Sequence, residues 1–315
     1  MRRPIVRLSS LQLTNIKNVK KGTIYMPNTV NKILSADKAE ILGIYGQNGS
    51  GKTAIVDALY FLQKVMIGAD LDQSLEDYMD MDSDTAEIFA DFNIFMDGIV
   101  FEIGYRLSLS REEKEVVISR ETLSAAKNEN GIRTNKTVFM DYQRDQANAI
   151  FKPQKRLDEI LEENKEIKTD LIVARKMAEK SNCSYIFGES SREIFCREYK
   201  NGFQHFSVII SSLFEFAVKD LFVIRNTHSG VISANFVLPM AFRVENDNIG
   251  AKGDFTVSLT EPILVDEERK NLLETIVEQI NIVLYTIIPG LQVTIKNYGK
   301  QSLDDGEEGW KLELM

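Results

Sequence analysis

The stretch Ile41-Leu42-Gly43-Ile44-Tyr45-Gly46-Gln47-Asn48-Gly49-Ser50-Gly51-Lys52-Thr53 decides the fold of this chain. Its first five residues are a short apolar run bounded by glycine, which predicts a buried parallel strand. A glycine-rich loop follows, and from Lys52 to Met66 apolar residues recur at the spacing of a helix. Strand, loop and helix therefore come in the order that a phosphate-binding loop requires.

Each defined residue of this loop has a physical task. Gly46, Gly49 and Gly51 permit unusual backbone dihedrals and leave no Cβ in the way of a phosphate. Backbone N–H groups at the helix N-terminus face the negative charge, Lys52 should reach the β- and γ-phosphates, and Thr53 should ligate magnesium. We therefore predict a nucleoside triphosphate site for ATP and Mg²⁺, with a glycine turn and an exposed lysine as the alternative. The predicted binding residues are Gly46, Gln47, Asn48, Gly49, Ser50, Gly51, Lys52 and Thr53, and Thr53 is also the predicted metal ligand.

The composition is typical of a soluble globular chain. Of the 315 residues 43% are hydrophobic, which suffices for one large or two ordinary domains. No stretch is apolar enough to span a membrane, and two cysteines are too few for a disulfide framework, so we expect a cytoplasmic protein. The net charge of −9 argues against a generally basic nucleic-acid-binding surface, and it leaves a local basic channel for DNA as an open alternative.

The rest of the chain divides into three expected parts. Residues 1–152 form a lobe that holds the phosphate loop and a β subdomain, 153–220 an inserted helical lobe, and 221–315 a return to the first lobe with strands and a helix. The acidic stretch 70–84 is interpreted as a solvated loop. The expected strands are 5–8, 11–13, 23–26, 88–95, 100–109, 116–118, 221–224, 234–238, 291–296 and 310–315, with a turn at Asp97-Gly98. The expected helices are Leu157 to Ala178, Ser191 to Asp220 and Leu272 to Ile288.

Two segments carry a family resemblance over about the first 65 residues. Leu11-Gln12-Leu13-Thr14-Asn15-Ile16-Lys17-Asn18-Val19, together with Gly43 to Leu59, resembles the ABC-type ATPases related to SMC and RecF proteins, and among them the bacterial AAA family ATPases of the OLD-like kind. The resemblance implies an α/β fold, a P-loop NTPase head with a mixed sheet, an N-terminal antiparallel β subdomain and an inserted helical lobe. It also implies a homodimer in which each nucleotide lies between one P-loop and the signature motif of the partner.

The resemblance also calls for residues that the sequence does not clearly supply. No signature-like sequence occurs. The string Ile263-Leu264-Val265-Asp266-Glu267 is the candidate Walker B segment, but Pro262 precedes only three apolar residues, so a helix start near Arg269 is the preferred interpretation. No catalytic residue is therefore assigned.

Other polar residues are further candidates for nucleotide contacts. Gln143 and Gln146 are candidates for the glutamine that senses the γ-phosphate, and ordinary loop glutamines are the favoured interpretation. Arg7, Lys17 and Lys20 could touch the nucleotide from the N-terminal β pair, although basic residues in an exposed turn need no such role.

Three functions remain as hypotheses. The first is an ATP-dependent switch that works by head dimerisation, in DNA maintenance or anti-phage defence, with an effector protein as partner. The second is a nucleotide-binding regulatory or scaffold protein without hydrolysis of its own. The third is a P-loop kinase that acts on a small molecule, and it is disfavoured because the sequence has no arginine cluster typical of a kinase lid. The alternating stretch from Trp310 to Met315 ends without a turn, so we expect the N-terminal part of a longer ATPase, with a truncation or split gene as the competing explanation.

Overall fold

The computed structural model divides the chain into two compact units, Met1–Leu221 and Phe222–Met315. Each unit is described by itself. The residues that the structure describes are 3–71, 73–112, 115–144, 151–152, 167–196, 204–221, 223, 225–226, 232–233, 240–246, 251–257, 263–265, 274, 277–278, 281–282, 285, 293–297 and 308–314.

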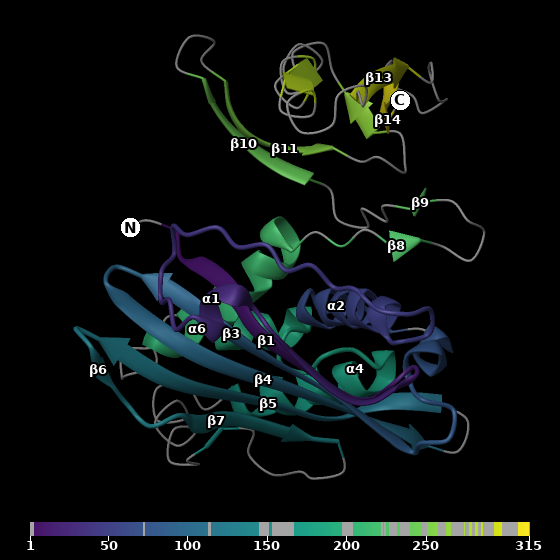
Figure 1. Ribbon diagram of the computed structural model, residues 1–315. Coiled ribbons are helices and arrows are strands. Elements are labelled where there is room, and N and C mark those ends of the chain that lie inside the picture. The colour runs from purple at the N-terminus through teal and green to yellow at the C-terminus, as the bar shows by residue number, and fades with distance from the viewer. Residues whose placement is uncertain are drawn as a thin grey trace. The chain divides into compact units, whose positions relative to one another are not determined.

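A seven-stranded antiparallel sheet forms the frame of the first unit (Figure 1). The strand order is β2-β1-β3-β4-β5-β6, and β7 also pairs with β5. The strands are β1 Ile5–Ile16, β2 Val19–Tyr25, β3 Thr85–Met96, β4 Ile99–Glu112, β5 Glu115–Glu129, β6 Ile132–Arg133 and β7 Thr137–Gln143. This arrangement confirms the expected N-terminal pair and the meander, and Asp97 and Gly98 form the turn with φ of 45° and 83°.

The two faces of this sheet differ because side chains alternate along each strand. One face carries the buried apolar side chains of the core, among them Leu11, Ile88 and Leu107, and helices lie against it. The other face is polar. Its cross-strand register places Thr14, Glu87, Ser108 and Arg120 in one row across four strands.

The helices of the first unit cover the apolar face, around which the sheet curls (Figure 1). The helix that follows the glycine loop, α2, runs from Lys52 to Met66 and buries Ala54, Ala58, Phe61 and Leu62. The other helical segments are α1 Pro27–Val30, the 3₁₀ turn η1 Gln73–Tyr78, α4 Ile167–Ser181, α5 Glu189–Phe195, α6 Gln204–Glu215 and the π turn η2 Phe216–Asp220. Among the described helices, none is long and apolar enough to cross a membrane.

A buried carboxylate ties the turn between α4 and α5 to the sheet. Glu121 of β5 is fully buried and accepts hydrogen bonds from the Tyr105 hydroxyl (2.6 Å), the Ser184 hydroxyl (2.6 Å) and the Tyr185 N–H (2.7 Å). Burial raises the pKa of the Glu121 carboxyl above its ordinary value, although the three donors oppose the shift. The donors explain how a carboxylate is tolerated inside this core.

The expected buried strand at residues 41–45 is wrong. This run forms no strand in the structure, and the exposed fractions of Ile41 and Tyr45 are 92% and 93%. A strand needs a neighbour that accepts and donates its backbone hydrogen bonds, and no described segment pairs with this run. The acidic stretch 70–84 also differs from the expected solvated loop, because its apolar members Leu71, Leu75 and Met79 are buried.

In the second unit, the strands that the structure describes form three small antiparallel sheets. The expected final hairpin is confirmed, since β13 pairs with β14, and β12 pairs with the other edge of β14. The described residues 274, 277, 278, 281, 282 and 285 are helical, within the helix expected from Leu272 to Ile288. The strands are β8 Arg225–Asn226, β9 Ile232–Ser233, β10 Met240–Asn246, β11 Ala251–Val257, β12 Ile263–Val265, β13 Val293–Asn297 and β14 Glu308–Leu314.

Several sequence-based expectations lie outside the described residues. They are the first part of the helix expected from Leu157, the strand expected at 234–238, Gln146, and the acidic pair Asp266 and Glu267 of the candidate Walker B string.

Candidate phosphate-binding site

The glycine loop lies at the N-terminus of α2. Residues 46–50 are exposed, and Gly51 occupies the N-cap position of the helix with φ of 89°. Gly49 also has a positive φ, 82°, and a Cβ built there would meet no atom within 4 Å. Two left-handed glycines bend the chain so that it enters the helix directly after the loop. The first N–H groups of α2, which have no partner within the helix, are thereby presented beside the loop.

Lys52 folds back over this loop. Its ammonium Nζ donates to the carbonyl oxygens of Gly46 and Gln47, each at 2.6 Å. The loop is further closed by a hydrogen bond from the Ser50 N–H to the Gln47 carbonyl at 3.2 Å. The ammonium therefore lies at the centre of the loop, where a bound phosphate would exchange these carbonyls for charged oxygens.

The turn between β1 and β2 supports the loop from the side. Asn18 donates a side-chain hydrogen bond to the Gly49 carbonyl. A Cβ at Gly51 would lie 2.6 Å from Val19 Cγ2, so only glycine fits between this turn and the helix. Lys17 in the same turn has φ of 50°, a left-handed conformation that is uncommon for a residue with a side chain.

An ion pair joins this turn to the helix. Lys17 Nζ pairs with the carboxylate of Asp57, whose side chain is only 7% exposed on α2. The sequence makes Lys17 a candidate nucleotide contact, whereas the structure places it against the helix that carries the loop. Asp57 and Asn18 support the loop and are not among the residues that the sequence pattern predicts. The available signal was an aspartate on the otherwise apolar face of α2, because a buried charge requires a partner.

The other two basic candidates for nucleotide contact, Arg7 and Lys20, also bind other parts of the protein. Arg7 donates to the Ala36 carbonyl at 2.7 Å, and Lys20 pairs with Asp80 at 2.5 Å. The hydrogen bond from Lys20 lowers the pKa of the Asp80 carboxyl. These side chains hold neighbouring segments in place.

The chemistry of the loop fits a phosphate chain better than it fits a metal ion alone. Backbone N–H groups and one ammonium are donors for phosphate oxygens, and the exposed Thr53 can offer one hydroxyl oxygen to Mg²⁺. Within the described residues, no group of three histidine, cysteine, aspartate or glutamate side chains could hold a metal ion.

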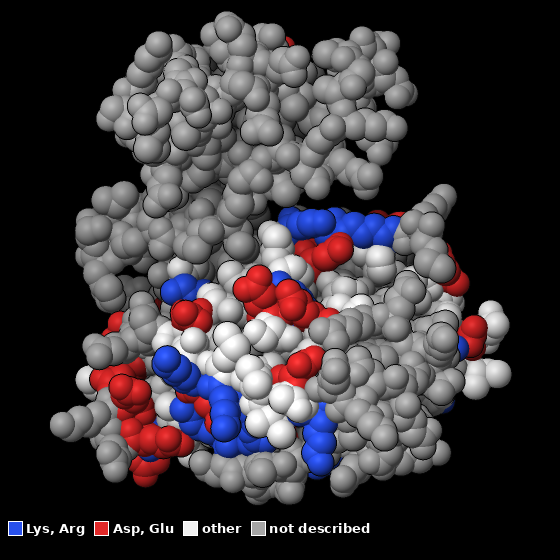
Figure 2. All heavy atoms as spheres, turned by 180° about the vertical axis from the view of Figure 1, so that it is seen from behind, with Lys and Arg blue, Asp and Glu red and all other residues white. Residues whose placement is uncertain are grey.

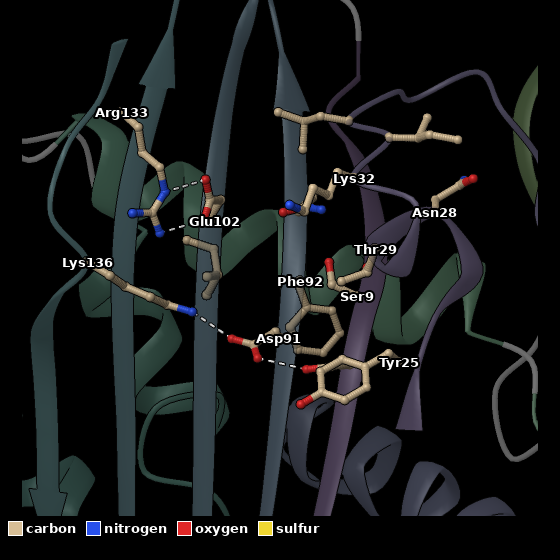
Figure 3. A pocket seen from close by; sticks show the side chains of 15 residues that line it. Ser9, Tyr25, Asn28, Thr29, Lys32, Asp91, Phe92, Glu102, Arg133 and Lys136 are labelled. Atoms are coloured by element: carbon tan, nitrogen blue, oxygen red, sulfur yellow. Dashed lines mark hydrogen bonds and ion pairs between the residues drawn. The ribbon is translucent and has the colours of Figure 1, made fainter. Parts of the chain in front are cut away.

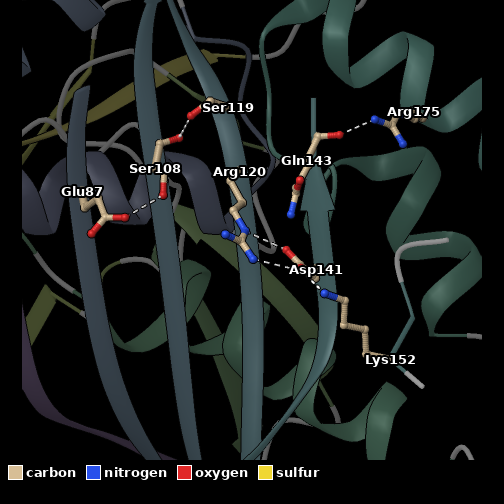
Figure 4. Close-up of polar contacts among 8 residues, drawn as sticks. All are labelled: Glu87, Ser108, Ser119, Arg120, Asp141, Gln143, Lys152 and Arg175. Carbon is tan, nitrogen blue, oxygen red and sulfur yellow. Dashed lines mark hydrogen bonds and ion pairs between the residues drawn. The ribbon is translucent and has the colours of Figure 1, made fainter. Parts of the chain in front are cut away.

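Gln143 does not contact the loop. It is the last residue of β7 and pairs with Arg120 on the neighbouring strand β5. Its backbone carbonyl accepts a hydrogen bond from Arg175 (Figure 4). Four strand spacings separate it from Thr14 of β1, which is roughly 19 Å along the sheet. Next to it Asp141 is bound by Arg120 and Lys152, and the pKa of its carboxyl is lowered by these hydrogen bonds against the opposing effect of burial.

Basic and acidic side chains lie next to one another on the described part of the molecule seen from behind (Figure 2). Most cations of the polar sheet face have an acidic neighbour, for example Arg106 with Glu87 at 3.2 Å. The thiols of Cys183 and Cys196 are free and half-buried, and burial raises the pKa of Cys183 to about 11.

Comparison with known proteins agrees with the loop chemistry. Residues 41–167 match the family model described as AAA domain, putative AbiEii toxin, Type IV TA system. The match begins at the apolar run before the glycine loop, and it confirms the similarity to AAA-type ATPases. Among curated proteins, none matches the sequence.

A solved structure described as "Structure of the recombination mediator protein RecF-ATP in RecFOR pathway" aligns with 13% identity and a TM-score of 0.29. The alignment covers 96% of this chain and 62% of that chain. The chain thus spans less than two thirds of the length of that protein.

Proposed function

We propose that this chain is the nucleotide-binding part of an AAA-type ATPase and that it binds ATP with Mg²⁺ through residues 46–53. The observation that carries the proposal is the position of Lys52 Nζ, which is held by the Gly46 and Gln47 carbonyls within a loop that two left-handed glycines lead into α2. The match of residues 41–167 to an AAA domain supports it independently.

Each group of the glycine loop would bind a particular part of the nucleotide. Loop N–H groups and the N-terminus of α2 bind the phosphate oxygens, Lys52 turns from the loop carbonyls to the β- and γ-phosphates, and Thr53 orients Mg²⁺. Bound ATP supplies the phosphoanhydride that such ATPases cleave. Asn18 and the pair of Lys17 with Asp57 keep the loop against the β1–β2 turn while Lys52 moves.

Calorimetric titration of the full chain with ATP and Mg²⁺ tests this proposal. Lys52→Ala should weaken ATP binding about 100-fold or more, since a charge-assisted contact to phosphate is lost. Lys176→Ala removes an exposed lysine on α4 and should leave the affinity unchanged. Equal affinities of the Lys52→Ala variant and the unchanged chain would refute binding at this loop.

We further propose that ATP promotes pairing of two such heads as a switch, in DNA maintenance or in anti-phage defence. The family description names a putative toxin of a type IV toxin–antitoxin system, which fits the second setting. Sedimentation of the chain with ATP and with ADP tests the switch. A larger dimer fraction with ATP is expected, and identical sedimentation with both nucleotides would rule it out.

A regulatory protein that binds ATP without turnover is the second candidate. It is favoured by the sequence, in which no signature-like motif occurs and the candidate Walker B string at 263–267 is better explained as the start of a helix. Phosphate release measured on the purified chain separates the two candidates. Turnover that Lys52→Ala abolishes would exclude the regulatory protein, and ATP binding without phosphate release would support it.

A further inference from the structure

A second cleft lies on the polar face of the sheet, at the other end of the β1–β2 hairpin from the glycine loop. The glycine loop contacts the turn at Asn18, whereas this cleft is lined by Ser9, Ser10 and Tyr25, where the hairpin strands pair at the opposite end. It measures about 700 Å³, and the segment that contains α1 forms its wall on the side opposite β6 (Figure 3). This volume is in the range of small-molecule sites.

The hydroxyl of Ser9 is buried at this cleft, where no described residue hydrogen-bonds to it. Ser9 is 7% exposed, and its Oγ has no hydrogen-bond partner among the described residues. Ser9 lies at a register shift of β1 between Leu8 and Ser10, so the bulge turns an extra polar residue toward the cleft wall. Buried hydroxyls are nearly always hydrogen-bonded in native proteins, so this one calls for a group that is supplied from outside.

The acidic side chains of the cleft are already satisfied by the cleft's own residues. Asp91 accepts from Lys136 at 2.6 Å and from the Ser10 hydroxyl at 2.8 Å. Glu102 receives a bidentate pair from Arg133 at 2.7 and 2.8 Å. These bonds occupy both oxygens of each carboxylate (Figure 3). The carboxylates are therefore poorly placed to bind a cationic ligand.

The basic side chains keep unused donors. Arg133 has five N–H groups and Lys136 has three, of which the ion pairs use only a part. Lys32 lines the same cleft and makes no ion pair within the described part of the chain. The groups in the cleft that remain free to bind a ligand are therefore mainly hydrogen-bond donors, and they belong to positively charged side chains. The ring of Tyr25, 55% exposed, and the side chain of Leu34 offer apolar surface for the body of a ligand.

We propose that this cleft binds a small organic anion, a phosphate ester or a carboxylate, through Lys32, Arg133, Lys136 and the Ser9 hydroxyl. The ligand's charged group meets the three cations and accepts a hydrogen bond from Ser9, and its apolar part lies on Tyr25. The site is separate from the glycine loop, so it does not depend on ATP binding there.

Calorimetry in the Lys52→Ala background tests the proposal, because phosphate binding at the glycine loop is then weakened. Pyrophosphate and citrate serve as probes, and the one that binds identifies the phosphate or the carboxylate class. Adding Lys32→Gln should weaken binding about tenfold, as expected for the loss of one charge-assisted contact. Lys38→Gln, the same change on an exposed lysine outside the cleft, should weaken it less than about twofold. Absence of binding by both probes at millimolar concentration, or equal weakening by both lysine variants, overturns the proposal.

Ser9→Ala distinguishes a ligand contact from a structural role. In the free protein it removes a buried hydroxyl to which no described residue hydrogen-bonds, so the Tm should stay unchanged or rise. Affinity for the binding probe should nevertheless fall several-fold. A lower Tm with unchanged affinity would show that the Ser9 hydroxyl supports the fold and would contradict its assignment to a ligand.

Discussion

At the scale of single residues, the site is supported by two charged side chains that belong to different elements. Lys17 comes from the β1–β2 turn and Asp57 from α2, and the carboxylate is almost completely buried. A buried carboxylate that loses its lysine keeps its desolvation cost and loses the attraction that offset it. The pair therefore couples the folding of the turn to the position of the helix.

Lys17→Met should lower the free energy of unfolding by about 2–3 kcal/mol, because Asp57 then remains buried without its lysine. Urea denaturation measures this. Lys20→Met is the matched control on β2, since the side chain of Lys20 is 62% exposed and Asp80 keeps its hydrogen bonds from the Asp82 N–H and the Ser83 hydroxyl. If Lys17→Met lowers the unfolding free energy no more than Lys20→Met does, the stabilising role assigned to the Lys17–Asp57 pair is contradicted.

A second prediction at this scale concerns the Glu121 carboxyl and the pH dependence of the unfolding free energy. Its pKa is raised in the folded state, so the folded protein holds this proton to higher pH than the unfolded chain does. The stabilisation from the protonated form is complete below the ordinary pKa of about 4.5 and is lost as pH rises through the raised value.

Glu121→Gln cannot ionise, so the unfolding free energy of this variant should fall less steeply as pH rises above about 4.5. Chemical denaturation at a series of pH values measures the difference in slope. Glu112→Gln changes an exposed glutamate at the end of β4 and should keep the slope of the unchanged protein. Identical slopes for the Glu121→Gln variant and the unchanged protein would show that this carboxyl does not control the pH dependence.

At the scale of elements, the glycine loop is a junction between α2 and the β1–β2 hairpin. Gly51 has a positive φ and also lies against Val19, whereas Gly98 has a similar φ in an open turn. Substitution at Gly98 therefore tests backbone strain alone, whereas substitution at Gly51 tests backbone strain together with a steric clash.

Gly98→Ala should cost about 1–2 kcal/mol of unfolding free energy, through left-handed backbone strain alone. Gly51→Ala should cost more and should also weaken ATP binding, because the new Cβ would lie 2.6 Å from Val19 Cγ2 and would push the turn from the helix. Urea denaturation and ATP titration of both variants measure the contrast. Equal losses of stability and intact ATP affinity in the Gly51→Ala variant would argue against this junction.

At the scale of the whole molecule, the contacts that define the phosphate site come from one unit. The turn, the loop and α2 all lie in the unit Met1–Leu221, which has its own sheet and core. A unit with its own core can fold alone.

The fragment Met1–Leu221 should therefore fold and bind ATP with an affinity within about threefold of the full chain. Circular dichroism and calorimetric titration measure both properties. A folded fragment whose affinity is more than about tenfold weaker would mean that residues after Leu221 complete the site.

The sequence by itself determined the features that local patterns encode. Alternation predicted the β1–β2 hairpin and the meander, Asp97-Gly98 marked its turn, and the glycine spacing located the loop before α2. These signals are reliable because strand and helix periodicity are properties of a few consecutive residues. The role of residues 46–53 in binding ATP remains a prediction.

Only the tertiary structure decided which distant residues meet. The partnership of Lys17 with Asp57 and the cleft at Ser9 depend on pairing between segments tens of residues apart, which periodicity does not contain. The run at 41–45 is a second case in which periodicity does not predict long-range pairing. Its apolar pattern is that of a buried strand, yet burial requires a pairing neighbour, and the described residues provide none.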